Sequence, residues 1–169
     1  MRREVERDAD VVREVEAAAF RQPGAVEEPI EAGLAVELRT SGVAIAGLSL
    51  VAEVDGQVVG HVVCSRGWVG EHPAVGLGPI GVLPERQGQG IGEALMHAVL
   101  GAADALDEPL VALLGNPAFY RRFGFVTSTV HGIEAPDPMW GEHFQVRLLT
   151  ACTPEVKGLF RYAEAFSGL

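Results

Sequence analysis

Cysteine is scarce in this sequence, and its scarcity excludes two structural devices. The 169 residues include two cysteines, Cys64 and Cys152, which lie far apart along the chain. Two isolated cysteines cannot form the disulfide framework of a small secreted domain, and they lack the paired spacing of a structural zinc site. We therefore expect no metal, and we expect a reducing cytoplasm as the location.

Long apolar runs are absent as well. The longest stretches free of Asp, Glu, Lys and Arg are Thr40–Ala52 and His72–Pro84. Both fall short of the ~18 residues that a membrane-spanning helix needs. The first residues, Met1–Asp8, carry charges of both signs and lack the apolar centre of a signal peptide. The sequence therefore predicts a protein with no membrane partner.

Positive charge is in short supply. The chain has 13 Lys and Arg against 23 Asp and Glu, which gives a net charge of −10. Phosphate contacts need clustered Lys and Arg, so nucleic acid is not an expected partner. An acidic surface could attract a cationic amine, although most such surfaces only aid solubility. Apolar residues make up 48% of the chain, enough for one domain over residues 1–169 with a sizeable core.

Glycine is abundant where an apolar stretch meets an amphipathic one. Gly88, Gly90 and Gly92 follow Val82 and lead into a predicted helix over 91–106. Glycines permit positive φ and close approach of a ligand, and a helix start offers free N–H groups to an anion such as a pyrophosphate. The third glycine comes one residue too early for a dinucleotide fingerprint, and no lysine follows as in a P-loop. A dinucleotide-dependent oxidoreductase is thus a remote alternative.

The spacing of this segment resembles motif A of the GNAT superfamily of N-acetyltransferases. That motif is Val-x-Pro followed by Gln/Arg-x-x-Gly-x-Gly/Ala, and it is met by Val82, Pro84, Gln87, Gly90 and Gly92. The resemblance implies that the turn holds the pyrophosphate of acetyl-coenzyme A (acetyl-CoA).

A second match follows at a distance that fits one helix and one strand. The strand-like run Leu110–Leu114 precedes the segment Gly115–Phe125, which is similar to the family's motif B, a short helix with Asn and Tyr followed by Gly-Phe. The two motifs in order are more specific than either alone. They imply an α+β GNAT acyl-CoA N-acyltransferase fold, with a mixed central sheet of about six to seven strands flanked by helices.

Hydrophobic periodicity and turn residues predict the elements. Predicted helices cover 8 or 10 to 20, 29–40 and 91–106, the first capped by Asp8 or Asp10. Predicted strands cover 48–54, 57–65, 75–82, 110–114, 125–133 and 143–149, the first two joined across Asp55-Gly56. Residues 66–74 are expected to form a mobile loop, and the apolar tail 157–166 is expected to dock on the domain.

The predicted strand Val75–Val82 contains three glycines and a proline, which weaken an interior strand. Such a strand suits close approach of another backbone or of an amide-bearing ligand. In the family this position is the strand where the sheet splays and the pantetheine amides pair with the backbone. The N–H of Ile80 or Val82 could then polarise the thioester carbonyl, whereas Pro79 has no N–H to donate.

The resemblance implies a set of coenzyme-binding positions and one catalytic residue. The coenzyme-binding positions are Ile80, Gly81, Val82, Gln87, Gly88, Gln89, Gly90, Ile91, Gly92, Asn116 and Phe119. Tyr120 stands where the family has a general acid that protonates the departing thiolate, with a packed core tyrosine as the alternative. For Asn116, an ordinary helix N-cap before Pro117 is the favoured interpretation.

The sequence does not identify the general base that removes a proton from the amine, because no residue of the predicted strand Val75–Val82 is acidic. Candidates are Glu31, Glu53, His61, Glu71 and His72, and each is better explained as a surface or hydrogen-bonded residue. Cys64 is expected in the core. Trp68 and Trp140 are expected to pack, with a substrate pocket as the alternative. Arg86, Arg121 and Arg122 could meet coenzyme phosphates, with solvated surface arginine as the alternative.

These observations predict an N-acetyltransferase that moves the acetyl group of acetyl-CoA to a primary amine by direct transfer in a ternary complex. The alternative is a catalytically idle acyl-CoA sensor or interaction module of the same fold. The acceptor, a small-molecule or peptide amine, is not identified by the sequence, and a homodimer stays open. In the family, acceptor specificity resides in segments that correspond here to 22–41, 66–74 and 135–142.

Overall fold

A mixed β-sheet forms the centre of the protein. The structure, a computed structural model, describes residues 1–163. The strands within this range are β1 (Arg2–Arg3), β2 (Leu50–Val54), β3 (Gln57–Val69), β4 (His72–Val82), β5 (Leu110–Leu114), β6 (Val126–Thr127), β7 (Ile133–Glu134), β8 (Phe144–Leu148) and β9 (Gly158–Tyr162). The helices are α1 (Ala9–Phe20), α2 (Ile30–Thr40), α3 (Ile91–Ala105) and α4 (Pro117–Tyr120). The main path through the sheet is β1-β2-β3-β4-β5-β8-β6.

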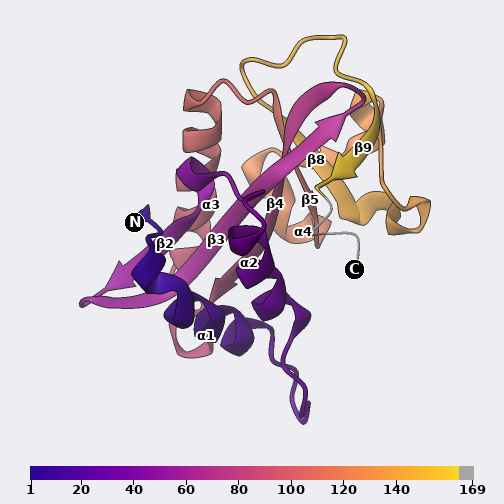
Figure 1. Cartoon of the computed structure of the whole chain (residues 1–169). Helices are drawn as coiled ribbons and strands as arrows, with labels where there is room; N and C mark the ends of the chain where they lie inside the picture. The colour runs from indigo at the N-terminus through magenta and orange to yellow at the C-terminus, as the bar shows by residue number, and fades with distance from the viewer. Residues whose placement is uncertain (164–169) are drawn as a thin grey trace.

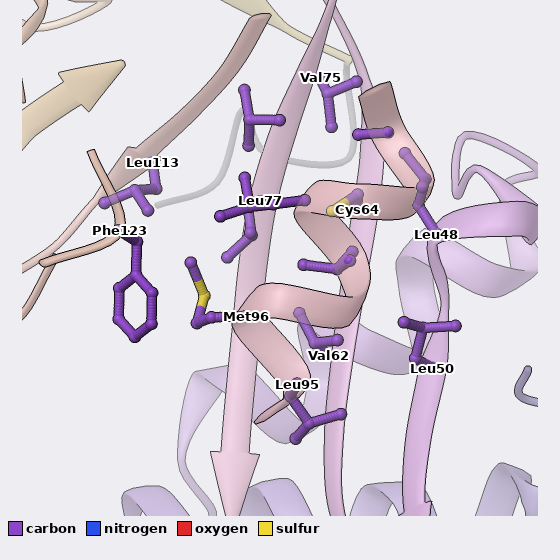
Figure 2. Close-up of a cluster of buried hydrophobic side chains, with 14 of the residues drawn as sticks. Leu48, Leu50, Val62, Cys64, Val75, Leu77, Leu95, Met96, Leu113 and Phe123 are labelled. Carbon is purple, nitrogen blue, oxygen red and sulfur yellow. The ribbon is translucent and has the colours of Figure 1, made fainter. Parts of the chain in front are cut away.

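Helices cover both faces of the sheet, as expected for strands whose side chains alternate between two apolar faces. On one face, Leu95 and Met96 of α3 pack against Leu50, Val62 and Cys64 in the largest core cluster (Figure 2). Helices α1 and α2 cover the other face near the N-terminal strands (Figure 1). Cys64 is fully buried, as predicted. No helix within residues 1–163 is both long and apolar enough to cross a membrane.

The prediction of a loop over 66–74 is wrong. These residues continue β3 and open β4 in one long hairpin, with Arg66 opposite Val75 and Val69 opposite His72. The reason is a partner about 90 residues downstream, because β9 pairs with this end of β3 and places Phe160 against Gly67. Local sequence cannot reveal such pairing. The docked tail is confirmed as far as residue 163, and the rest of 157–166 lies outside the described residues.

The predicted strand over 125–133 is also wrong in its extent. Only Val126–Thr127 pair with β8, and a 3₁₀ turn follows over Ser128–His131. Gly132 then takes a positive φ of 72°, which ends the turn, and Ile133–Glu134 pair with β9 instead. The 3₁₀ turn, in which Ser128 is buried, therefore interrupts the predicted strand.

Helix α1 starts where it was predicted, but for a different reason. Asp8 precedes the helix, yet its carboxylate makes no capping hydrogen bond to α1. It accepts instead from the Val5 N–H at 2.9 Å and from the Arg2 guanidinium at 2.7 and 3.0 Å. Asp8 therefore fixes the N-terminal arm, which carries β1, to the start of α1.

The sheet opens between β4 and β5, and this opening positions the site. These parallel strands pair only through Val75 with Val111 and Gly76 with Ala112. Beyond that point the rest of β4, Leu77–Val82, has no pairing with β5. The chain leaves β4 toward the N-terminus of α3, and it leaves β5 toward α4. Two helix starts and one unpaired strand edge therefore meet at one end of the sheet.

Candidate functional site

Two adjoining cavities occupy the opening between β4 and β5. The first, here the turn cavity, has a volume of about 460 Å³ and is lined by the end of β4, the glycine turn, the start of α3 and α4. The second, here the aromatic cavity, has a volume of about 420 Å³ and lies between β4, β5, α1, α2 and the C-terminal segments. Ile80, Phe119 and Tyr120 line both cavities.

Most of the coenzyme-binding positions predicted from the sequence line the turn cavity. Those that do are Ile80, Val82, Gln87, Gly88, Gly90, Ile91, Gly92 and Phe119. Three do not: the Gly81 Cα lies beneath a carboxylate from α1, Gln89 folds back onto the turn, and Asn116 lines the aromatic cavity.

The turn is shaped by two glycines and two glutamine side chains. Gly88 and Gly90 have positive φ of 71° and 81°, a conformation that other residues adopt at a cost. Gly92 lies inside α3 without a positive φ, so the turn uses the conformational freedom of glycine at Gly88 and Gly90 and not at Gly92. The Gln87 side-chain amide donates to the Val82 carbonyl at 3.0 Å, and that of Gln89 donates to the Glu85 carbonyl at 3.2 Å.

The turn cavity combines a helix N-terminus with two arginines. Gly90 is the N-cap of α3, so the first N–H groups of this 15-residue helix lack helical partners and carry partial positive charge. Arg86 and Arg122 line the cavity, together with Glu93, and the Arg122 guanidinium lies 4.9 Å from the centre of the Phe119 ring. Arg121 lines a different surface hollow. An anion would therefore meet Arg86 and Arg122 but not Arg121.

The three glycines of β4 differ in what occupies the space where a Cβ would lie. A Cβ at Gly76 would lie 2.7 Å from the Tyr162 ring, and one at Gly81 would lie 2.6 Å from Oε2 of Glu16. At Gly78, by contrast, nothing lies within 4 Å. Two of the three glycines thus make room for protein side chains, and Gly78 leaves open space for the close approach that the sequence predicts.

The free edge of β4 presents two backbone N–H groups to the opening. The Leu83 N–H donates to the Val59 carbonyl of β3 at 2.9 Å. Because N–H directions alternate along a strand, the N–H groups of Val82 and Ile80 point away from β3. They face the side on which β5 has diverged, where both residues line the turn cavity.

Tyr120 stands at the junction of the two cavities. Its ring lies on Gly115, the residue after β5, where a Cβ would come within 2.3 Å of the ring. The ring also makes edge contacts with Phe119 and Phe125 at centroid distances of 4.9 and 6.0 Å. Burial raises the pKa of the Tyr120 phenol to about 12, so the hydroxyl stays protonated at neutral pH. Tyr120 is therefore both packed and present on the walls of both cavities.

Asn116 behaves as the favoured interpretation predicts. Its side-chain oxygen accepts from the Ala118 N–H at 2.9 Å and so caps α4, with Pro117 in the first turn. This cap fixes the start of the short helix that carries Phe119 and Tyr120.

The aromatic cavity is walled mainly by apolar side chains from distant parts of the chain. Phe20 of α1 and Leu34 of α2 form one wall, and Trp140 and Tyr162 form another. Trp140 packs on Phe144 and Tyr162 at centroid distances of 5.9 and 6.4 Å, so it both packs and lines a cavity. Trp68 is not part of either cavity lining and lies on the long hairpin.

Among the five candidate bases, Glu31 alone lines the aromatic cavity. Glu53 forms an ion pair with Arg2 at 2.8 Å, and Glu71 and His72 lie exposed at the hairpin turn. His61 is buried between two carboxylates, with Nδ1 2.7 Å from Glu16 and Nε2 3.2 Å from Glu4. Its role is the hydrogen-bonded one that the sequence favoured.

Glu16 is the residue that sequence reasoning missed. Its side chain is fully buried, and its Oε2 has no hydrogen-bond partner and lies against Gly81 of β4. Burial raises the pKa of this carboxyl, and the contact with His61 lowers it in part. A signal was present, because Glu16 lies four residues after Val12 and four before Phe20 on the apolar stripe of α1. Within the described part of the chain, no three acidic, His or Cys side chains are grouped to hold a metal ion.

The sequence of this chain is similar to a known protein family and to curated relatives. The family described as acetyltransferase (GNAT) domain matches residues 46–127. The uncharacterized N-acetyltransferase YhbS of Escherichia coli K12 is 35% identical over 144 residues, which span 83% of this chain and 86% of the relative.

Two solved structures share the fold over nearly the whole chain. A GNAT family N-acetyltransferase (YhbS) from Escherichia coli in complex with CoA has a TM-score of 0.88 and 32% identity, covering 98% of this chain and 90% of that one. A GNAT family acetyltransferase from Brucella melitensis in complex with acetyl-CoA has a TM-score of 0.78 and 35% identity, covering 98% and 96%. The predicted mixed sheet with flanking helices is confirmed, although the described residues form nine strands, three of them only two residues long.

Proposed function

The chain belongs to the GNAT family of acetyltransferases, and on that basis we propose that it transfers the acetyl group of acetyl-CoA directly to a primary amine. One observation carries the proposal beyond family membership. The turn cavity and the aromatic cavity meet at Ile80, Phe119 and Tyr120, so a donor in one would place its reactive end next to an acceptor in the other. Holding two reactants in contact is the main requirement for direct transfer.

The coenzyme would occupy the turn cavity. Its pyrophosphate would accept hydrogen bonds from the N–H groups at the start of α3, and Arg86 and Arg122 would add positive charge. The pantetheine arm would run along the edge of β4 that faces β5, because the β4 backbone is not paired with β5 from Leu77 onward. Gly78 leaves that approach open, since no atom lies within 4 Å of the Cβ position.

The transfer step would use the groups at the junction. The amine nitrogen attacks the thioester carbonyl carbon, and the Ile80 or Val82 N–H stabilises the negative charge that develops on the carbonyl oxygen. The carbon–sulfur bond then breaks, and the Tyr120 hydroxyl protonates the coenzyme A thiolate. Because burial raises the pKa of this phenol to about 12, its proton is in place at neutral pH when the thiolate departs, and the phenolate that donation leaves is reprotonated from solvent.

A covalent acetyl-cysteine route has less support. Cys64 is completely buried in the α3 core cluster, and burial raises the pKa of its thiol well above the ordinary value. Cys152 also has a raised pKa, and it lines neither cavity. Since the chain has two cysteines in all, direct transfer is the favoured mechanism.

An idle acyl-CoA sensor of the same fold is the alternative, and one feature favours it. The strand β4, His72–Val82, carries no carboxylate that could act as a base. Two measurements separate the possibilities. Thermal melts with acetyl-CoA should show stabilisation, by ~2.7 kcal/mol at 100 times Kd. Thiol release over an amine panel should exceed the rate without amine. Binding without amine-stimulated release would support the sensor, and absence of binding would refute both.

A further inference from the structure

We propose that the acceptor is a primary amine borne on an apolar, ring-containing body without a carboxylate, and that Glu31 binds its ammonium group. The inference rests on the proposed function and specifies the acceptor of the same site. It comes from the composition of the aromatic cavity, where a single carboxylate stands among aromatic and aliphatic side chains.

The walls of the cavity favour a ring-bearing body. Phe20, Leu34, Pro79 and Trp140 bring apolar surface from four separate segments of the chain, and the polar side chains beside them are few. A cavity of about 420 Å³ with such walls is suited to a small organic molecule whose apolar part is buried. Burial of a phenyl ring in such a cavity should therefore raise kcat/KM for the amine by about tenfold or more.

Glu31 supplies the charge that an ammonium needs. Among the lining residues that the structure describes, it is the only Asp or Glu. It lies in the first turn of α2, is half-buried, and its charge helps to raise the pKa of the buried Glu16. Tyr120 and Trp140 also line this cavity, and aromatic rings attract a cation that lies over their faces.

The charge count argues against other amine classes. A polyamine or an aminoglycoside presents several ammonium groups, and one carboxylate cannot pair them all. An amino acid presents a carboxylate beside its amine, but no Lys, Arg or His belongs to the cavity lining within residues 1–163. Burying that carboxylate without a cation would be costly.

The proton balance then closes around Glu31. The bound ammonium gives one proton to the Glu31 carboxylate, which passes it to solvent, and the free amine attacks the acetyl carbon. The carbon–nitrogen bond forms, the nitrogen loses its second proton to solvent, the carbon–sulfur bond breaks, and the thiolate takes the Tyr120 proton. Tyr120 regains a proton from solvent, so the sum is an amide, coenzyme A and one released proton.

A matched set of amines tests the acceptor class on the wild-type protein with saturating acetyl-CoA. We expect kcat/KM for 2-phenylethylamine to exceed that for ethanolamine, which lacks the ring, and that for phenylalanine, which adds a carboxylate, each by at least tenfold. A higher kcat/KM for spermidine, phenylalanine or a lysine peptide would overturn the inference and leave the proposed function standing. Absence of any amine-dependent thiol release, with acetyl-CoA bound in thermal melts, would instead refute the proposed function.

Two pairs of variants test the residues. Glu31→Gln should raise KM for 2-phenylethylamine at least tenfold and leave KM for acetyl-CoA unchanged, whereas Glu37→Gln, exposed on the same helix, should match wild type. Trp140→Ala should lower kcat/KM for 2-phenylethylamine but not for ethanolamine, and Trp68→Ala, outside the cavity, should lower neither. Equal losses on both amines in Trp140→Ala, or an unchanged KM in Glu31→Gln, would contradict the assignment.

Discussion

Single residues at the junction of the two cavities decide what the site can do. Tyr120 reaches both cavities because its ring lies directly on the backbone of Gly115, in space that any side chain there would fill. The sequence motif pointed to Tyr120, but the requirement for Gly115 emerges only from the contact.

Removing the Tyr120 hydroxyl should slow the chemical step without weakening coenzyme binding. Because Tyr120→Phe keeps the ring and its contacts with Phe119 and Phe125, kcat should fall by ~10²-fold or more, as for loss of a general acid. Steady-state kinetics measures kcat, and thermal melts with acetyl-CoA measure binding. An unchanged kcat would show that the thiolate obtains its proton elsewhere.

Adding a methyl group at Gly115 should displace the Tyr120 ring. The new Cβ would lie 2.3 Å from the ring, so Gly115→Ala must shift the ring or the strand end, and kcat should fall at least tenfold. Gly101→Ala is the matched control, because it lies on the exposed side of α3 with nothing within 4 Å. That control should keep full activity and gain ~0.5–1 kcal/mol of stability from helix propensity. Wild-type kinetics in Gly115→Ala would contradict the packing described.

At the scale of elements, the C-terminal strand holds the long hairpin and one wall of the aromatic cavity in place. Strand β9 pairs with β3 and with β7, and alternate residues point inward and outward along it. Phe160 is completely buried, whereas its neighbour Leu159 is 45% exposed.

Truncating Phe160 should therefore be far more costly than truncating Leu159. Phe160→Ala leaves a cavity against Phe144, Tyr162 and Gly67, and it should lower the free energy of unfolding by ~3–5 kcal/mol. Leu159→Ala on the same strand should cost less than ~1 kcal/mol. Urea unfolding of both variants measures the difference. Similar losses would mean that β9 does not dock in the observed register.

The N-terminal arm gives a pH-dependent prediction. The Arg2 guanidinium lowers the pKa of the Asp8 carboxyl from 3.8 to about 2 in the folded protein. A lowered folded pKa adds stability that is present above pH 3.8 and is lost as the pH falls through about 2. After screening at the partly exposed Arg2, this amounts to about 1 kcal/mol. The melting temperature of Asp8→Asn should thus fall less steeply than that of wild type between pH 4 and pH 2, while that of Asp10→Asn should parallel wild type.

The elements predicted correctly are those whose signals are local. A few neighbouring residues suffice to predict the Asp55-Gly56 turn, the glycine turn after Val82 and the apolar stripe of α3. Residues 66–74 form strand in the folded chain, where β9 lies beside β3, and a 3₁₀ turn over Ser128–His131 interrupts the run from 125 to 133. Glu16 escaped notice because its partners, His61 and Gly81, lie on strands far along the chain.

At the scale of the whole molecule, the opening between β4 and β5 brings distant segments to one site. The glycine turn and α3, which the sequence motifs predict, lie on one side of the opening. Helices α1 and α2 and the C-terminal segments lie on the other side (Figure 1). Their sequences carry no motif, and they come together only in the folded chain. The donor side could therefore be predicted from the sequence, whereas the acceptor side required the structure.

Detection of the acetylated amine itself distinguishes acetyl transfer from hydrolysis of acetyl-CoA. Wild-type protein is incubated with acetyl-CoA and 2-phenylethylamine, and the amine is analysed by mass spectrometry alongside coenzyme A release. We expect one acetyl group to be gained by the amine for each coenzyme A released, with both signals reduced ~10²-fold or more in Tyr120→Phe. Coenzyme A release without acetylated product from this or any other amine would show hydrolysis in place of transfer and would refute the proposed function.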